Sequence, residues 1–408
     1  MKNLKIVHLS DNDISGGSAF YANRIHNFLK DYKNIKSEMH VLYKKSNDES
    51  IIKFKFKENL NIWKNFYFFF LSKRNKYSFY NYGKYVINNI LQVSNILKND
   101  TNAIIIYNNS NFISPNIFNF FHKKNISIFL YLTDMEMITG GCHYNFECNN
   151  YQNSCYNCPA FKFLFKRMAE KNLSEKKLSF YNINLTFLVP NTQIKKNLEN
   201  SAIFNKVKHK IIDFKLSLDL NKYSPEENEK KSKRIFSFRS SLNPRKGQGY
   251  LLKSLDYLKR IRPDFIKLIH FNILGDSSII DFLNEKKISF KFFEKVNNEK
   301  KLINFYRQSD FFINQSVQDV GPTMVPEALS CGIPIISFNN GMATDLIEND
   351  LNGYLVKNRS SEDLAHAINQ CINLDEKKLK LLKSQSRTTA LNHLDLSKAI
   401  KNVIDQIN

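Results

Sequence analysis

Two acidic residues on either side of a Gly-Pro-Thr turn form the part of this sequence most suited to chemistry. Asp319 precedes the turn Gly321-Pro322-Thr323, and Glu327 follows it. The N–H groups at a helix amino terminus can bind an anion, whereas nearby carboxylates repel a bare phosphate but accept hydrogen bonds from sugar hydroxyls. A ligand that carries both phosphate and hydroxyl groups, such as a nucleotide sugar, satisfies both requirements.

The residues that follow this turn predict a short helix, a tight turn and a buried strand. Thr323 is expected to cap the helix, and Pro326 is tolerated because it falls in the first turn. Gly332 is expected to end the helix, because glycine readily adopts the left-handed conformation found there. The apolar run at residues 333–338 then predicts a buried strand.

A second strand-loop-helix segment supplies cations. Residues 234–239 predict a strand that ends at Arg239, and Lys246-Gly247 precedes a helix with leucines at helical spacing. Cations at the start of a helix oppose its dipole, so their presence calls for another partner. The fork of Arg239 and the point charge of Lys246 suit a pyrophosphate, and a solvated loop is the alternative.

The first strand, residues 5–9, leads into a loop that contains Gly16 and Gly17 and then into a helix. Open α/β sheets bind ligands at the carboxyl ends of their strands, and glycines let the backbone approach a ligand closely. We therefore expect substrate near Gly16 and Gly17. A tight strand-to-helix turn without a ligand is the alternative.

Four of the six cysteines lie in one short loop, at Cys142, Cys148, Cys155 and Cys158. The first residues predict a strand and not an export signal, so a disulfide framework is disfavoured. The two-residue gap between Cys155 and Cys158 suits tetrahedral zinc, and His143 is a further candidate for ligation or for substrate contact. Reduced, packed cysteines are the alternative to a structural zinc site.

The length of 408 residues and the alternation of strands and helices predict a two-domain α/β protein. We place the first domain at residues 1–217, a polar linker at 218–233 and the second domain at 234–388. We expect the helical residues 389–408 to pack back on the first domain.

The net charge of +22 limits the partners that the protein can meet. No nucleic-acid-binding motif accompanies the charge, so we exclude nucleic acid and retain phosphorylated substrates, an anionic membrane surface or a merely solvated basic surface. Aromatic and basic residues alternate at 59–83, which suits either an interfacial membrane segment or a core-facing helix with a basic side. No apolar run is long enough to span a bilayer. We expect a cytoplasmic protein, at most peripheral on the inner face of the membrane.

Taken together, these segments resemble the retaining GT-B glycosyltransferases of glycosyltransferase family 4, and the resemblance covers nearly the whole chain. Its most specific element is the pair of acids separated by seven residues and followed by Ala-Leu-Ser-Cys-Gly-Ile-Pro-Ile-Ile. The Thr-Gly-Gly-Cys-His-Tyr segment resembles a subset of that family found in bacterial surface-polysaccharide assembly. The residues that carry the resemblance are Asp319, Glu327, Arg239, Lys246-Gly247, Gly16-Gly17, 134–159 and 352–356.

The resemblance implies a GT-B fold, in which two Rossmann-like doubly wound domains face each other across a cleft. It also implies a nucleotide-diphosphate sugar donor, linked to UDP or GDP, and a saccharide or lipid-linked acceptor. Glu327 would hold the donor ribose, Asp319 would face the sugar hydroxyls, and Arg239 and Lys246 would neutralise the pyrophosphate. Gly17 and the backbone at residues 321–323 would close on the phosphates. No metal is required for this chemistry.

The sequence departs from the family pattern at two positions. Asp319 stands where the family usually has Glu, and Thr133 stands where members often have a His that contacts the donor sugar. Asp134 and His143 are the candidates to replace that contact. A changed donor preference is one consequence, and a weak or inactive enzyme is another. The alternative functions are a non-catalytic sugar-nucleotide-binding or scaffold protein, and another GT-B enzyme such as an epimerase or phosphorylase.

Overall fold

The computed structural model of the protein describes most of the chain and divides it into two compact units. The first unit comprises Met1–Phe214 with Lys401–Asn408, and the second comprises Lys215–Ile400. The aromatic and basic segment 59–83 lies outside the described residues, except for 78–80. The described residues are 3–54, 78–80, 85–94, 97, 100–107, 110, 112–161, 166–181, 183–204, 209–226, 232–294, 296 and 298–407.

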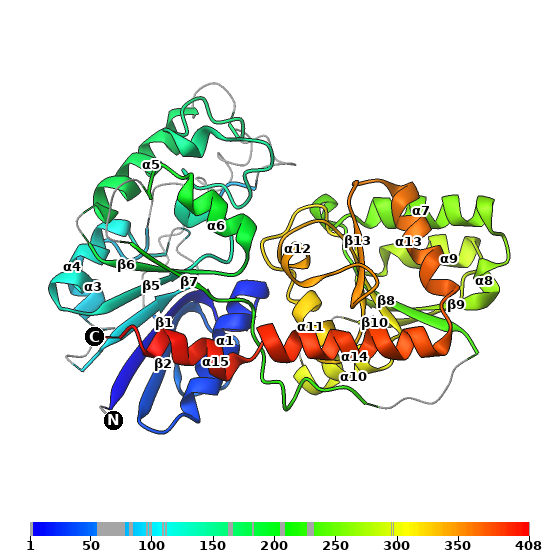
Figure 1. The fold of residues 1–408 in the computed structure, drawn as a ribbon. Helices are drawn as coiled ribbons and strands as arrows, with labels where there is room; N and C mark the ends of the chain where they lie inside the picture. The colour runs from blue at the N-terminus through cyan, green and yellow to red at the C-terminus, as the bar shows by residue number, and fades with distance from the viewer. Residues whose placement is uncertain are drawn as a thin grey trace. The chain divides into compact units, whose positions relative to one another are not determined.

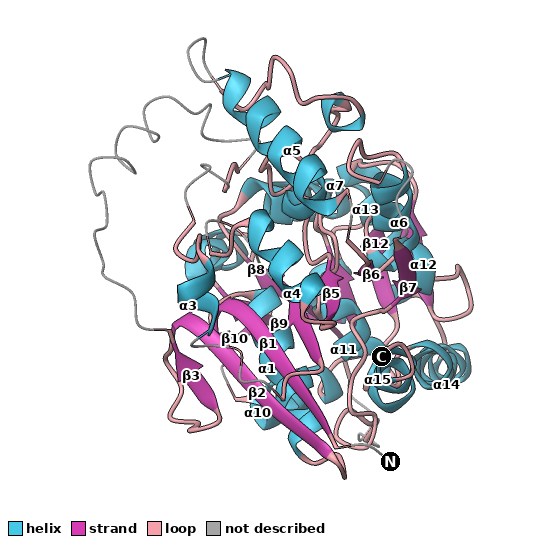
Figure 2. Cartoon of the chain, turned by 90° about the vertical axis from the view of Figure 1, so that its left-hand side faces the viewer, coloured by secondary structure: helices cyan, strands magenta, loops and turns pink. Residues whose placement is uncertain are grey.

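The first unit is built on a seven-stranded parallel sheet with the strand order β3-β2-β1-β4-β5-β6-β7. Figure 2 shows β1, β2 and β3 side by side at one end of this sheet. Strands β2 and β3 lie on one side of β1, and strands β4 to β7 lie on the other side, so the strand order reverses between β1 and β4. The strands are β1 (Leu4–Asn12), β2 (Ile35–Tyr43), β3 (Ile51–Lys53), β4 (Ala103–Ile106), β5 (Ser127–Tyr131), β6 (Leu185–Val189) and β7 (Lys210–Asp213).

The helices of the first unit bury one apolar face each. In α1 the buried residues include Ala22, Ile25 and Leu29, whose spacing of three and four places them on one side of the helix. The described helices of this unit are α1 (Gly17–Lys30), α3 (Ile90–Ser94), α4 (Phe118–Lys123), α5 (Lys166–Phe180) and α6 (Thr192–Glu199).

The second unit repeats the architecture with a six-stranded parallel sheet of order β10-β9-β8-β11-β12-β13 (Figure 1). Here the order reverses between β8 and β11. The strands are β8 (Arg234–Ser240), β9 (Ile269–Gly275), β10 (Phe290–Glu294), β11 (Phe311–Asn314), β12 (Ile335–Phe338) and β13 (Gly353–Val356).

The helices of the second unit enclose a core made of strand phenylalanines and isoleucines with helix leucines. Leu251, Leu255 and Leu258 of α7 enter this core at the predicted helical spacing. The helices are α7 (Gln248–Ile261), α8 (Phe265–Leu268), α9 (Ile280–Glu285), α10 (Glu299–Arg307), α11 (Met324–Ser330), α12 (Met342–Leu346), α13 (Ser361–Ile372), α14 (Glu376–His393) and α15 (Leu396–Ile404), the last of which crosses the unit boundary at residue 400.

The two doubly wound sheets confirm the predicted α/β class, and one local prediction is wrong. Thr323 occupies the position before α11, but its side chain makes no capping hydrogen bond, because its backbone is already helical. Pro326 does fall in the first turn of α11, and Gly332 ends the helix with φ +73°. Strands β2, β3 and β10 were not predicted.

The residues near the ends of the second unit are tied by backbone hydrogen bonds. The N–H of Leu218 donates to the carbonyl of Leu394 at 2.8 Å, and the N–H of Leu396 donates to the carbonyl of Leu218 at 3.1 Å. In the first unit, the Nζ of Lys210 donates to Gln406 at 3.0 Å. Among the helices that the structure describes, none is long and apolar enough to cross a membrane.

Candidate functional site

The predicted phosphate-binding residues lie where the strand order of the second sheet reverses. Arg239 is near the carboxyl end of β8, and residues 315–323 follow the carboxyl end of its neighbour β11. In open parallel sheets the crevice outside such a reversal is the usual place for a ligand. The loop from β11 therefore starts at the expected ligand-binding edge and leads into α11, whose first turn carries Glu327.

The carboxylate of Asp319 is the centre of a charged cluster at this edge. Its Oδ2 accepts a hydrogen bond from the Nζ of Lys246 and lies 3.1 Å from the Nη1 of Arg245. Burial lowers the pKa of Lys246, Asp319 opposes that effect, and the positive charges of Arg245 and Arg239 lower the pKa further. Two cations therefore contact one carboxylate, and the charge of Arg239, at the end of β8, also acts on Lys246.

The loop that carries Asp319 is fastened to its neighbours on both sides. The Nη1 of Arg245 donates to the carbonyl of Gln318 at 2.9 Å, and the N–H of Val317 donates to the carbonyl of Arg245 at 2.9 Å. The amide of Asn340 accepts from the N–H of Asp319 at 3.1 Å and donates to the carbonyl of Ser316 at 3.2 Å. These bonds hold the carboxylate against the two cations.

Two glycines allow the backbones at this edge to come close together. Gly247 has φ +69°, and a Cβ added there would lie 1.8 Å from the carbonyl oxygen of Gln315. Gly341 has φ +55°, and a Cβ there would lie 2.4 Å from the carbonyl oxygen of Asp319. Any other residue would combine backbone strain with a steric clash, so both positions require glycine.

Glu327 is buried inside the second unit and is held by a tyrosine. The hydroxyl of Tyr306, on α10, donates to Oε2 of Glu327 at 2.7 Å, and both side chains are at most 2% exposed. Burial and then the charge of Glu327 raise the pKa of Tyr306 well above its usual value, so this hydroxyl stays protonated and remains a donor. Gly321 and Pro322 lie in the turn just before α11.

Thr133 joins the carboxyl edge of the first sheet to the start of α1. Its hydroxyl lies 2.9 Å from the carbonyl oxygen of Tyr107, which follows β4, and 3.0 Å from the hydroxyl of Ser18. Gly16 occupies the N-cap position of this helix, and Gly17 is its first residue. The threonine therefore links the glycine loop to the point where the strand order of the first sheet reverses.

Asp134 and His143 form a hydrogen-bonded pair at the same edge. The Nδ1 of His143 lies 2.8 Å from Oδ2 of Asp134, whose other oxygen accepts from the N–H of Glu136 at 2.8 Å. The imidazole is partly exposed and packs edge to face on the rings of Tyr80 and Tyr144. A carboxylate that fixes one imidazole nitrogen leaves the other for a substrate, as in proton transfer or sugar binding.

A buried ion pair anchors the loop that carries these two residues. Lys176, on α5, is fully buried and donates to Oε1 of Glu136 at 2.7 Å. The same Nζ donates to the carbonyl of Glu136 and, at 3.0 Å, to the carbonyl of Thr139. One ammonium group therefore satisfies three acceptors in the turn between Asp134 and His143.

The four cysteines of the predicted zinc site are free thiols whose charges influence one another. Burial, with a smaller contribution from neighbouring thiols, raises the pKa of Cys155 to about 12 and that of Cys158 to about 11. Burial also raises the pKa of Cys142. Within the described part of the chain, no group of three or more His, Cys, Asp and Glu residues is placed to hold a metal ion.

The structure adds three residues that the sequence analysis did not select. Arg245 was adjacent to a selected lysine, so its charge was a usable signal. Asp11 lies near Asp134. Burial raises the pKa of Asp11, and the charge of Asp134 also raises it. The position of Asp11 shortly after the apolar run of the first strand was a usable signal. Tyr306 gave no local signal, because its partner is 21 residues away.

Comparison with known proteins supports the interpretation of the second unit. Residues 219–388 match the family model described as glycosyl transferases group 1. Known GT-B glycosyltransferase structures share the fold of the chain. Sucrose-phosphate synthase from Thermosynechococcus elongatus aligns with a TM-score of 0.66 at 13% identity over 98% of both chains. HepE of Anabaena, solved with UDP, aligns with a TM-score of 0.64 at 13% identity over 99% of both chains.

Curated relatives match over shorter segments. An Escherichia coli UDP-Gal:alpha-D-GlcNAc-diphosphoundecaprenol alpha-1,3-galactosyltransferase is 24% identical over 210 residues, which cover 46% of this chain and 51% of the relative. Spore coat protein SA of Bacillus subtilis (strain 168) is 27% identical over 172 residues, which cover 39% of this chain and 45% of the relative. The chain thus spans about half the length of the curated relatives it matches. The family match and the fold together support a group 1 glycosyltransferase.

Replacing Lys176 by Met should destabilise the first unit, because Glu136 and two carbonyls would lose their buried donor. Breaking a buried ion pair typically costs about 3 to 5 kcal/mol, so we expect the free energy of unfolding, measured by urea denaturation, to fall by that amount. Lys171→Met on the same helix is the matched control, because that side chain is 77% exposed. Equal stability of the two variants would contradict the anchoring role.

Proposed function

We propose that the protein is a retaining glycosyltransferase that moves a sugar from a nucleotide-diphosphate sugar to a saccharide or lipid-linked acceptor in bacterial surface polysaccharide synthesis. The observation that carries the proposal is the pair of cations, Arg245 and Lys246, held by Asp319, with the exposed Arg239 at the end of the neighbouring strand β8. It lies at the ligand-binding edge of the unit that matches the group 1 family model.

The cation cluster suits the diphosphate of the donor. Three cations and one carboxylate leave an excess of two positive charges, which matches a dianionic diphosphate. Negative charge grows on this group as the bond to the sugar breaks, and cations that are already in position stabilise it without reorganisation. Arg239 is exposed, so its guanidinium is accessible to a ligand. Asp319 keeps Arg245 and Lys246 in place until the donor binds.

Glu327 is proposed to hold the ribose of the nucleotide. A carboxylate accepts hydrogen bonds from vicinal hydroxyls, and Tyr306 occupies one of its oxygens and fixes its rotation. The backbone of Gly321, Pro322 and Thr323, which directly precedes α11, would approach the phosphates. The acid at position 319, one methylene shorter than the usual Glu, is proposed to act mainly on the cations.

The carboxyl edge of the first sheet is proposed to act on the transferred sugar or on the acceptor. Thr133, which hydrogen-bonds Ser18 at the start of α1, has no imidazole to offer the sugar. His143, whose ring is fixed by Asp134, offers an imidazole in the same unit. We propose that this pair replaces the usual histidine contact. Gly16 and Gly17 would let the backbone approach the donor.

The names of similar proteins support a UDP-sugar donor and a lipid-linked acceptor. The Escherichia coli relative is named for a UDP-galactose donor and a diphosphoundecaprenol acceptor, and HepE of Anabaena was solved with UDP and glucose. A GDP-linked donor stays a further proposal. An acceptor of this kind would place the protein at the inner face of the cytoplasmic membrane, where its net charge of +22 favours anionic lipid. The transfer is proposed to need no metal, and a structural zinc in the cysteine loop stays a prediction.

UDP or GDP should bind to the wild-type protein in a calorimetric titration, and Lys246→Ala should weaken that binding. A charge-assisted hydrogen bond contributes about 1.5 to 3 kcal/mol, so we expect a loss of roughly ten- to one-hundredfold. Lys253→Ala is the control, because Lys253 is an exposed lysine on α7. The proposal would fail if neither nucleotide bound at any concentration tested.

Tyr306→Phe should weaken UDP binding several-fold and leave pyrophosphate binding unchanged. The substitution removes only the hydroxyl that orients Glu327, so the ribose contact suffers while the cations stay in place. Tyr257→Phe on α7 serves as the control for removal of a tyrosine hydroxyl. If UDP and pyrophosphate lost affinity equally, the tyrosine would instead support the fold as a whole.

His143→Gln should lower turnover about one-hundredfold while the affinity for UDP stays within about twofold, as expected for a residue that acts on the reacting groups. Turnover is measured as the release of nucleoside diphosphate from a panel of UDP- and GDP-sugars in the presence of a lipid-linked acceptor extract. His393→Gln, at an exposed position on α14, is the control. A scaffold protein would release no diphosphate in an acceptor-dependent manner, even in its wild-type form.

A further inference from the structure

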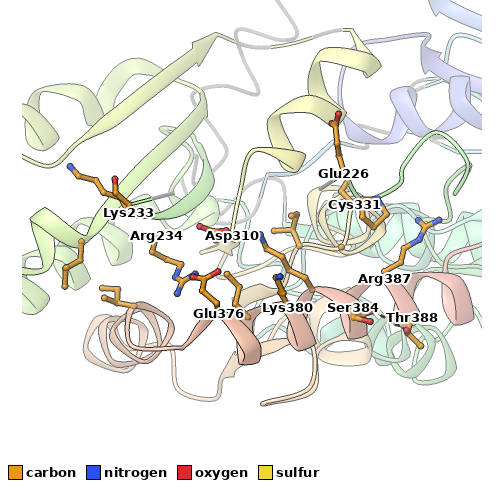
Figure 3. A pocket seen from close by; sticks show the side chains of 18 residues that line it. Glu226, Lys233, Arg234, Asp310, Cys331, Glu376, Lys380, Ser384, Arg387 and Thr388 are labelled. Carbon is orange, nitrogen blue, oxygen red and sulfur yellow. Dashed lines mark hydrogen bonds and ion pairs between the residues drawn. The ribbon is translucent and has the colours of Figure 1, made fainter. Parts of the chain in front are cut away.

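A cavity in the second unit lies away from the proposed donor site. It has a volume of about 770 Å³, which is within the usual range for a small-molecule site (Figure 3). Its walls combine cationic, acidic and apolar side chains. The lining residues include Lys233, Arg234, Asp310, Glu376, Lys380 and Arg387.

The cavity is at the opposite edge of the sheet from Arg239. Arg234 begins β8, Leu268 directly precedes β9, and Asp310 directly precedes β11. Ile333 lies two residues before β12. Because all strands of this sheet are parallel, their amino ends share one edge and their carboxyl ends share the other. A ligand in this cavity would therefore not occupy the proposed donor site.

One face of α14 forms the other wall. Glu376, Leu379, Lys380, Lys383 and Arg387 line the cavity, and their spacing of three and four places them on the same side of the helix. Figure 3 shows Lys380 and Arg387 on this helix, with Asp310 and Arg234 between them and Lys233. The cavity is thus enclosed between a helix face and a sheet edge.

Hydrogen bonds fix the frame of this cavity. The Nζ of Lys383 donates to Oδ1 of Asp310 at 2.8 Å, and Oδ2 of Asp310 accepts from the N–H of Ile235 at 2.9 Å. Arg234 donates to the carbonyl of Leu374 at 2.7 Å and lies 3.3 Å from Glu376. The strand edge and the helix are therefore joined by two ion pairs, which keep the walls apart at a set distance.

The remaining cations of the wall form no ion pair with the residues that the structure describes. Five cationic and three acidic side chains line the cavity. Arg387 donates to the carbonyls of Tyr223, Ser330 and Leu220, so three of its N–H groups are satisfied without a carboxylate. Neither Lys233 nor Lys380 forms an ion pair with another residue that the structure describes. The positive charge left over attracts an anion.

We propose that this cavity binds a phosphate group that is attached to a small apolar body. Lys233 and Lys380 would contact the phosphate, since ammonium groups are common phosphate ligands and can move to meet it. Leu268, Ile333 and Leu379 supply an apolar surface for the rest of the ligand. Either a soluble phosphorylated metabolite or the headgroup of an anionic lipid has this chemistry.

Titration of the full chain with phenyl phosphate tests the soluble source, and sedimentation with phosphatidylglycerol vesicles tests the lipid source. We expect Lys233→Ala/Lys380→Ala to weaken binding of at least one probe about tenfold or more, as the loss of two charged contacts predicts. Lys377→Ala is the matched control, because Lys377 is an exposed lysine of α14 outside the cavity. Circular dichroism checks that each variant is folded.

Arg239→Ala separates this site from the proposed donor site. Binding of the affected probe should survive this substitution, whereas UDP binding should fall, so failure of one proposal does not imply failure of the other. Loss of phenyl phosphate binding alone identifies a soluble ligand, and loss of vesicle binding alone identifies a lipid headgroup. The proposal is overturned if neither probe binds, or if the double variant binds both probes as tightly as the wild type.

Discussion

The proposed donor site depends on one carboxylate that holds two cations. Asp319 binds Arg245 and Lys246, which come from the loop after the neighbouring strand, and so joins the two sides of the point where the strand order reverses. Without this carboxylate, Arg239, Arg245 and Lys246 would repel one another. The shorter side chain at position 319 therefore does not by itself indicate a lost site, because in this structure its main partners are cations.

The architecture could be predicted from the sequence because apolar β-rich runs and helical spacing are local properties. The strand that ends at Arg239 was predicted, and its parallel pairing with β11 brings their carboxyl ends together. Strands β2 and β10 were missed for a physical reason. The apolar residues of β2 are interrupted by Lys36, Ser37, Glu38 and His40, and β10 is partly exposed, so neither strand shows a continuous apolar run.

What the sequence could not provide are the pairings between distant side chains. Tyr306 with Glu327 and Lys176 with Glu136 join residues 21 and 40 positions apart, and neither helix carries a motif that indicates the pairing. The same holds for Asp134 and His143, which were selected separately and are brought together by the turn that Lys176 anchors. The types of residues predicted the chemistry, whereas their mutual orientation required the fold.

The two edges of the second sheet show why net charge alone is a poor guide to function. At the carboxyl edge, Arg245 and Lys246 share one buried carboxylate, Arg239 adds a further positive charge, and these charges lie beside loops that bring backbones close together. At the amino edge, ion pairs and backbone carbonyls satisfy most cations, and among the described residues only Lys233 and Lys380 of the cavity wall have neither an ion pair nor a backbone carbonyl as partner. The many lysines of this chain therefore form a specific anion-binding site only where packing limits the number of acceptors around them. That constraint, and not the total of +22, distinguishes a binding site from a solvated basic surface.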